Sequence, residues 1–142
     1  MQEKDKQLAL KYLSYRLRSE FEMRKYMAQK DVPEEDIDEI IDYLYSYKYL
    51  DDHAYAKAFI NDKINFHPCG RYKIIHELEV RGIEHLIIEK ALEECLPYEK
   101  EENILQCEYE KYIKKGKTHE KALRYFYTKG YPSELLGHLE RS

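Results

Sequence analysis

The chain has 142 residues, a formal net charge of −4 and a pI of about 5.9, with 43% hydrophobic and 37% charged residues. That length suits one domain or a few small modules. The apolar runs are only a few residues long, which excludes a transmembrane helix, and the charged start MQEKDKQ lacks the apolar core of a signal peptide. Five glycines and four prolines are too few for an all-β fold, and three widely spaced cysteines indicate reduced thiols. We therefore expect a cytoplasmic protein that does not bind membranes.

Charged residues are sorted along the chain. Segment 16–30 holds five basic and two acidic residues, and segment 111–129 holds seven basic residues and one acidic residue. Segment 34–42 has six acidic residues and no basic one, and segment 93–110 has seven acidic residues and one basic residue. The pattern predicts a bipolar surface, although ordinary solvated helix faces explain it equally well. The acidic total argues against non-specific nucleic-acid binding by the whole surface.

The first fifty residues predict three helices. The first covers residues 5–17, and its inward residues are Leu8, Ala9, Tyr12, Leu13 and Leu17. Ser19 and Glu22, three residues apart, predict a capping box at the start of the second helix. Pro33 begins the third helix, where its missing N–H costs nothing, and the acidic residues after it suit the positive end of the helix dipole.

Four tyrosines alternate at positions 43, 45, 47 and 49, which taken alone is the period-two signal of a strand. The signal overlaps a helical pattern that ends at Leu44, and no partner strand follows. We interpret this segment as the frayed end of the third helix, with partly exposed tyrosines.

The central helices follow from caps and breaks. Asp51 and Asp52 are expected to cap the fourth helix, which breaks at residues 67–70. Gly82 ends the fifth helix, because glycine adopts the left-handed conformation of a C-cap at little cost. Ile83 and Glu84 are then expected to start the sixth helix at once.

The last third of the chain predicts three more helices. Leu96-Pro97 breaks the pattern, and a long helix follows from about residue 99 to residue 115. Gly116 ends that helix, Thr118 caps the next one, and the last helix starts after Pro132.

The second and third helices of the first segment recur twice. Adding 51 to a residue number maps the first copy onto the second, and adding 48 maps the second copy onto the third. The matched sets are Met23, Ile74 and Ala122; Met27, Leu78 and Phe126; Val32 and Ile83; Gly82 and Gly130; and Ile37, Ile88 and Leu136. A fixed period of this size is typical of stacked supersecondary units, although any two short amphipathic helices can be aligned by chance. We predict an all-α fold of about nine helices in three three-helix repeats, at residues 1–50, 51–97 and 98–142.

Catalytic and metal motifs begin in this sequence but are not completed. Gly116-Lys117-Thr118 resembles the end of a P-loop, but position 111 is lysine where the motif needs glycine, and no strand precedes it. His76 begins a zinc-protease pattern, but position 80 is valine where the second histidine belongs. His67 and Cys69 have no second ligand pair at metal-site spacing. We expect no enzyme activity, no metal and no cofactor.

Three motifs in order resemble those of the RecX family. The first, R-x-x-S-x-x-E-[LM], is carried by Arg16, Ser19, Glu22 and Met23. The second, L-[DN]-D-x-x-[FY]-A, is carried by Leu50, Asp51, Asp52, Tyr55 and Ala56. The third, G-x-x-x-I-x-x-E-L-x-x-[KR]-G-I, is carried by Gly70, Ile74, Glu77, Leu78, Arg81, Gly82 and Ile83.

The resemblance implies an elongated and curved array of three-helix repeats that regulates the RecA recombinase. It implies binding in the groove of the RecA–DNA filament and inhibition of RecA ATPase, recombinase and co-protease activity, which modulates recombination and the SOS response. The partners it implies are the RecA nucleoprotein filament and single- or double-stranded DNA, with the protein acting as a monomer.

Basic residues are the candidates for contact with a filament or with phosphate. They are Arg16, Arg18, Arg24, Lys25, Arg71, Lys73, Arg81, Lys111, Lys114, Lys115, Lys117, Lys121, Arg124 and Lys129. Three basic residues, Lys30, Arg81 and Lys129, occupy equivalent repeat positions. A structural explanation competes there, because a cation near a helix C-terminus is stabilised by about 0.3–1 kcal/mol. Two other functions stay open: a DNA-binding helical module, and a helical scaffold for another protein.

Overall fold

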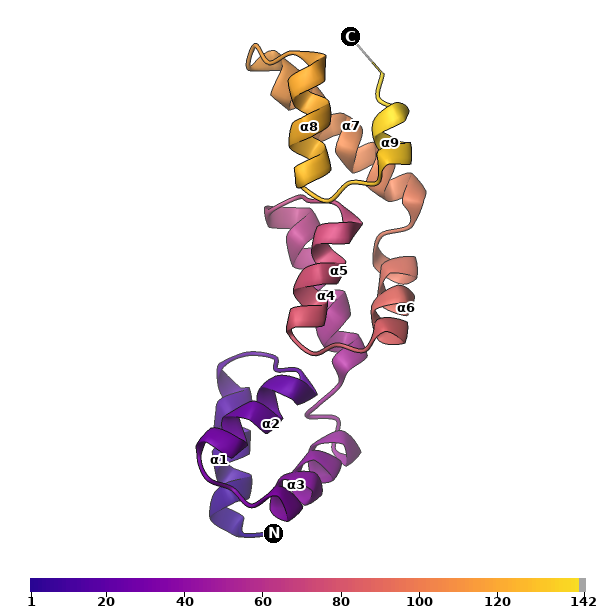
Figure 1. Cartoon of the computed structure of the whole chain (residues 1–142). Coiled ribbons are helices and arrows are strands. Elements are labelled where there is room, and N and C mark those ends of the chain that lie inside the picture. The colour runs from indigo at the N-terminus through magenta and orange to yellow at the C-terminus, as the bar shows by residue number, and fades with distance from the viewer. Residues whose placement is uncertain (141–142) are drawn as a thin grey trace.

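The computed structural model describes residues 1–140, and this part of the chain is entirely helical apart from turns and loops. Its helices are α1 (Glu3–Tyr15), α2 (Glu20–Gln29), α3 (Glu34–Ser46), α4 (Asp52–Phe66), α5 (Arg71–Val80), α6 (His85–Cys95), α7 (Tyr98–Lys114), α8 (His119–Thr128) and α9 (Ser133–Gly137). They follow one another along an elongated molecule with its two ends far apart (Figure 1). The all-α prediction is confirmed, and no described helix is long and apolar enough to cross a membrane.

The helices fall into three groups, and each group has its own apolar core. We call α1–α3 repeat 1, α4–α6 repeat 2 and α7–α9 repeat 3. The core of repeat 1 includes Ala9, Met23, Met27, Ile40 and Leu44. The core of repeat 2 includes Ala56, Ile60, Ile74, Leu78 and Ile88. The core of repeat 3 includes Leu105, Tyr109, Ala122, Phe126 and Leu136.

One turn recurs between the second and third helices of every repeat. Asp31, Gly82 and Gly130 occupy it with φ values of 61°, 79° and 92°. The residue that follows each of them donates its N–H back to the helix, as Ile83 does to the Leu78 carbonyl at 3.1 Å, and its side chain is buried. This is the hydrogen bonding of a left-handed helix C-cap with its hydrophobic contact. The prediction that Ile83 starts the sixth helix is wrong, because Ile83 belongs to this turn and α6 begins at His85.

Two further differences concern the first repeat. Helix α1 ends at Tyr15, and Arg16 is extended, with φ of −170°. The prediction that Leu17 lies inward is wrong, because Leu17 lies beyond the helix and is 55% exposed. At the end of α3 the tyrosine segment forms no strand, as interpreted, and Tyr45, Tyr47 and Tyr49 are exposed. The helix end is not frayed, because Lys48 takes a left-handed turn with φ of 59° and the Tyr49 N–H donates to the Leu44 carbonyl at 2.8 Å.

The second helices of the three repeats are joined end to end. At the junction of repeats 1 and 2, the Ser19 hydroxyl donates to the Arg81 carbonyl at 2.8 Å. At the junction of repeats 2 and 3, the Gly70 N–H donates to the Lys129 carbonyl at 2.8 Å. Ser19 and Gly70 are equivalent positions, and so are Arg81 and Lys129. The start of α2 therefore meets the end of α5 as the start of α5 meets the end of α8 (Figure 1).

Each junction also contains a buried carboxylate from the first helix of the following repeat. Asp52 of α4, 9% exposed, accepts the Glu20 N–H at the start of α2 at 2.9 Å. Glu101 of α7, fully buried, accepts the Arg71 N–H at the start of α5 at 2.8 Å. An acceptor here satisfies a helix-end donor that has no partner in its own helix. Asp51 caps α4 as predicted, but Asp52 caps the preceding repeat instead.

Substitution of Gly82 by alanine is expected to lower the free energy of unfolding by about 2–5 kcal/mol. The left-handed backbone costs an L-residue about 1–2 kcal/mol, and an overpacked contact adds about 1–3 kcal/mol. A Cβ at Gly82 would overlap the Phe21 side chain, whereas Gly116 has φ of 86° and open space around it. Gly116→Ala is therefore the matched control, with an expected loss of about 1–2 kcal/mol. Urea unfolding followed by circular dichroism measures both, and equal losses would contradict a tightly packed junction.

Stability should also depend on pH through Asp52. Burial raises the pKa of Asp52 above its ordinary value of 3.8, and the charges of Glu20 and Asp51 add to this, against the hydrogen bond from the Glu20 N–H. An acid with a raised folded-state pKa stabilises the protein most below its unfolded pKa, and this contribution is lost as the pH rises through the folded pKa. Asp52→Asn keeps an acceptor oxygen but cannot ionise. The variant should therefore gain stability relative to the parent between acidic and neutral pH, and a difference that does not change with pH would contradict this assignment.

Candidate binding grooves at the repeat junctions

The junction of repeats 1 and 2 forms a groove of about 330 Å³, here called the first junction groove. Three elements line it: the extended segment before α2, one face of α4, and the end of α5. The lining side chains used below are Arg16, Leu17, Tyr55, Phe59 and Arg81. The groove therefore combines two aromatic rings and two guanidinium groups with the Asp62 carboxylate.

The junction of repeats 2 and 3 forms a groove of about 260 Å³, here called the second junction groove. It has the same construction from the segment before α5, one face of α7, and the end of α8. Its lining includes His67, Lys111, Tyr112, Lys115, Tyr125 and Lys129. Adding 51 maps Arg16 onto His67, and adding 48 maps Arg81 onto Lys129, so one site type occurs twice in the chain.

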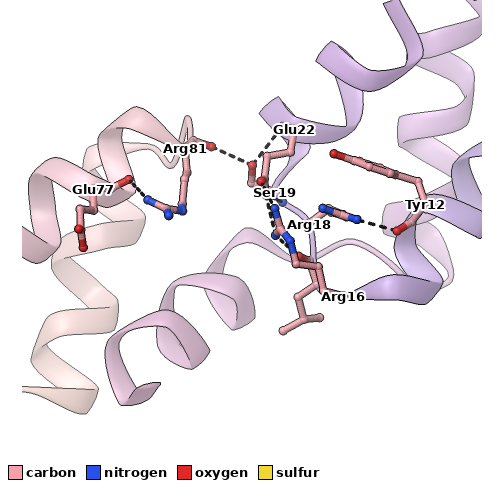
Figure 2. Close-up of polar contacts among 8 residues, drawn as sticks. Tyr12, Arg16, Arg18, Ser19, Glu22, Glu77 and Arg81 are labelled. Carbon is pink, nitrogen blue, oxygen red and sulfur yellow. Dashed lines mark hydrogen bonds and ion pairs between the residues drawn. The ribbon is translucent and has the colours of Figure 1, made fainter. Parts of the chain in front are cut away.

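Hydrogen bonds orient the cations of the first junction groove (Figure 2). Arg16 pairs with Glu22 at 2.6 Å and donates to the Leu17 carbonyl at 2.7 Å. Glu22 is itself held by the Ser19 N–H at 3.0 Å, as part of the predicted capping box, which is confirmed. Arg81 donates to the Glu77 carbonyl at 3.0 Å and lies 4.7 Å above the Phe59 ring. These contacts fix both guanidinium groups at the groove.

The Arg16–Glu22 pair is electrostatically coupled. Burial alone would raise the pKa of Glu22, but hydrogen bonds from Arg16 and from the Ser19 N–H outweigh burial and hold that pKa below its ordinary value. The same pairing raises the pKa of Arg16. Arg16 is therefore charged at every physiological pH, although Glu22 neutralises part of its field.

A stack of aromatic rings lies beside the first junction groove. Arg18 lies 3.7 Å above the Tyr12 ring and donates to the Tyr12 carbonyl at 3.2 Å. Tyr12 stacks on Tyr26 with a centroid distance of 3.8 Å. A side groove of about 350 Å³ is lined by both tyrosines, by Lys25 and by Arg81. Figure 2 shows Arg18 and Tyr12 on the repeat 1 side of this junction.

The second junction groove combines stacked tyrosines with lysines. Tyr112 and Tyr125 stack with a centroid distance of 4.7 Å, and the Lys129 ammonium lies 5.8 Å from the Tyr125 ring. Lys111 pairs with Glu108 at 3.1 Å, while no ion pair is recorded for Lys115 or Lys129 within residues 1–140. Aromatic rings of this kind can stack on planar groups, and the neighbouring ammonium groups can neutralise phosphates or carboxylates.

The structure separates the predicted basic residues into several environments. Arg24 and Arg71 are used in ion pairs, Arg24 with Glu20 and Asp38, and Arg71 with Glu101. The Arg71 side chain is only 11% exposed and lies 3.8 Å from the Tyr98 ring, so it supports the junction from within. Residues lining the grooves just described are Arg16, Lys25, Arg81, Lys111, Lys115 and Lys129.

The remaining candidates lie elsewhere. Lys114, Lys117 and Lys121 are exposed outside these grooves, and Arg124 lines a separate groove between α8 and α9. Lys73 lies at the second junction, where its backbone packs on Gly130. The prediction from sequence missed the aromatic side chains of the grooves, above all Phe59, Tyr112 and Tyr125. Repeat equivalence would have found His67, because it occupies the position of Arg16.

Fold and grooves together define an all-α tandem-repeat protein with a recurrent site of cations and aromatic rings at its repeat junctions. Within the described residues, no three His, Cys, Asp or Glu side chains are grouped so that they could hold a metal ion.

The chain belongs to the RecX family. Residues 6–44 match the model of the RecX first three-helix domain, and residues 51–92 match the model of its second three-helix domain. Relatives named regulatory protein RecX include one from Halalkalibacterium halodurans, 36% identical over an alignment of 137 residues that covers 91% of this chain and 50% of the relative. Another, from Finegoldia magna, is 42% identical over 94 residues, which are 66% of this chain and 46% of the relative. The chain is thus a member of a family of regulatory proteins.

Solved structures agree with this assignment. The crystal structure of RecX from Lactobacillus salivarius superposes with a TM-score of 0.88 and 26% identity, and covers 95% of this chain and 91% of that one. A second RecX crystal structure gives a TM-score of 0.85 and 27% identity over 96% of this chain and 71% of that one. The chain spans only part of the length of the relatives found by sequence. It covers 36% of a relative from Lactococcus lactis and 64% of one from Caldanaerobacter subterraneus.

Removal of the Ser19 hydroxyl should destabilise the folded protein more than removal of a hydroxyl that only caps one helix. Ser19 is fully buried, caps α2 and also bonds to the Arg81 carbonyl, whereas Thr118 caps α8 only. We expect Ser19→Ala to cost about 2–3 kcal/mol, the sum of a cap and a buried acceptor left unpaired. Thr118→Ala should cost about 0.5–1 kcal/mol as the matched control. Denaturant unfolding tests this, and equal losses would mean that the Ser19–Arg81 contact does not stabilise the junction.

Proposed function

We propose that this protein binds the RecA–DNA filament and inhibits RecA ATPase, recombinase and co-protease activity, and so modulates recombination and the SOS response. Family membership supports a regulatory role. The observation that carries the proposal further is the recurrence of one cation-lined groove at both junctions of an elongated array. A polymer with a repeating surface is bound well by a repeating site, because each added contact forms at high effective concentration.

The junction cations are the proposed contact residues. Arg81 and Lys129 occupy equivalent positions, one in each groove, and no carboxylate pairs with either within the described residues. Arg16, Arg18, Lys25, Lys111 and Lys115 extend the contact along the same junctions. Arg24 and Arg71 are left out, because carboxylates already neutralise them. The residue ranges 1–50, 51–97 and 98–142 are the proposed functional units, with residues 141–142 outside the described part.

The proposal describes a monomer in the cytoplasm that needs no cofactor. Cys69 and Cys95 are buried free thiols, and Cys107 is an exposed free thiol. Free thiols of this kind suit a reducing compartment. RecA and its DNA would be the only partners needed for activity.

The test is the double variant Arg81→Gln and Lys129→Gln in a titration of RecA ATPase on single-stranded DNA. Loss of one charge-assisted contact at each groove should weaken apparent inhibition about tenfold or more. The matched control is Lys90→Gln with Lys100→Gln, which removes two exposed cations outside the grooves. Circular dichroism checks that both variants stay folded. Inhibition that is equal in the two double variants would remove the junction grooves from the proposal.

A second function, direct DNA binding, is favoured by one observation. Tyr12 stacks on Tyr26 beside Arg18, and Tyr112 stacks on Tyr125 in the second junction groove. Aromatic rings next to cations are the groups with which proteins hold the bases and phosphates of single strands. Fluorescence anisotropy with labelled DNA in the absence of RecA measures it. Affinity should then fall steeply with salt, because bound phosphates release counterions. Absence of binding at low salt would leave RecA as the sole partner.

A further inference from the structure

The two repeat junctions share one arrangement of helices but differ in their bonding. At the junction of repeats 2 and 3, here called the second junction, the Gly70 and Tyr72 N–H groups donate to the carbonyls of Lys129 and Gly130 at 2.8 Å and 3.1 Å. At the junction of repeats 1 and 2, here called the first junction, no backbone-to-backbone hydrogen bond is recorded within residues 1–140. The bond from the Ser19 hydroxyl, shown in Figure 2, takes its place.

The charge at the start of the second helix also differs between the junctions. Arg71 begins α5, and its guanidinium pairs with the buried Glu101 of repeat 3 at 2.5 Å. Glu20 begins α2 at the equivalent position, so the first junction has a carboxylate there. The Glu20 amide bonds to Asp52 of repeat 2, but the Glu20 side chain pairs with Arg24 of its own helix. Among the described residues no ion pair ties repeat 1 to repeat 2, and the like charges of Glu20 and Asp52 repel each other.

Glycine lies on both sides of the second junction. A Cβ at Gly70 would overlap the Gly130 backbone, and a Cβ at Gly130 would overlap the Lys73 backbone, so the two backbones interlock. Ser19 takes the position of Gly70 at the first junction, and its amide is occupied by the Glu22 side chain. Its hydroxyl makes the contact instead, through a rotatable bond, and this restrains the angle between the repeats less than a direct backbone bond does.

The connecting segments differ in the same direction. Residues 47–51 connect α3 to α4, whereas only residues 96 and 97 connect α6 to α7. Pro97 has a φ that its ring fixes near −60°, directly before α7. In the longer segment the Leu50 N–H donates back to α3, while the Asp51 side chain caps α4. The backbone between Leu50 and Asp51 is therefore the point at which repeat 1 can turn relative to α4.

We propose that the first junction is a hinge on which repeat 1 turns, whereas repeats 2 and 3 move as one rigid unit. Hinges of this kind use a few residues at the ends of helices, and small interfaces between structural units allow them to move. The first junction groove takes Arg16 from repeat 1 and Arg81 from repeat 2, so its width changes with the hinge. The second junction groove keeps its shape. This inference stands apart from the filament proposal, because its test contains neither RecA nor DNA.

Double electron–electron resonance between two spin labels measures the motion at each junction. The pair for the first junction is Lys11→Cys with Lys90→Cys, in a chain that also carries Cys107→Ser. The pair for the second junction is Lys90→Cys with the native Cys107. These positions are exposed, and the two other cysteines are buried and stay unchanged. A pair within repeat 2, Asn61→Cys with Lys90→Cys and Cys107→Ser, gives the width of the distance distribution that the labels alone produce.

We expect a broader distance distribution across the first junction than across the second, whose width should match that of the pair within repeat 2. Glu20→Arg gives the first junction the residue type of the second, so it should pair with Asp52 and narrow the first distribution. Arg71→Gln removes the ion pair of the second junction and should broaden the second distribution. Glu34→Arg makes the same charge change at the exposed first residue of α3, away from both junctions, and is the matched control that should change neither.

Equal widths across the two junctions in the parent chain would overturn the hinge. A first distribution that Glu20→Arg leaves unchanged, or that Glu34→Arg narrows as much, would overturn it as well. Circular dichroism checks that each variant is folded. If Arg71→Gln unfolds, the comparison of the two parent junctions and the response to Glu20→Arg still decide the question.

Discussion

The structure depends on direct contact between the start of one second helix and the end of the next. The two sides of a junction lie so close that a Cβ at Gly70 would overlap the Gly130 backbone, and a Cβ at Gly82 would overlap the Phe21 side chain. A carboxylate from the following repeat closes each contact by accepting an otherwise unpaired amide. Asp31 takes the same left-handed turn in repeat 1, but it is exposed, so its side chain is accommodated.

The same junctions create the proposed binding surface. Arg81 and Lys129 are helix C-cap residues, where a cation is favoured by the helix dipole. They also line the two junction grooves. Stabilisation of the helix end and binding of a partner are therefore compatible roles for these two residues. The contact that positions each helix end also places its cation beside the aromatic rings of a groove.

Local patterns predicted local features well. The capping box at Ser19, the left-handed turn at Gly82 and the repeat register follow from contacts within a few residues, and the structure contains all three. Some predictions failed because the deciding partner lies far away in the chain. Asp52 resembles a cap of its own helix but bonds to Glu20, 32 residues earlier, and Arg71 resembles a free cation but pairs with Glu101, 30 residues later.

The amino-acid sequence by itself determined the all-α class, the threefold repeat of the helices and the three motifs that resemble the RecX family. Helix periodicity and capping are properties of neighbouring residues, so they can be read without the fold. The basic segments 16–30 and 111–129 are also visible in the sequence alone. Only the tertiary structure decided which cations pair with carboxylates and which tyrosines line a groove. These properties depend on which side chains meet across a junction, and that follows from the packing of whole helices rather than from any one segment.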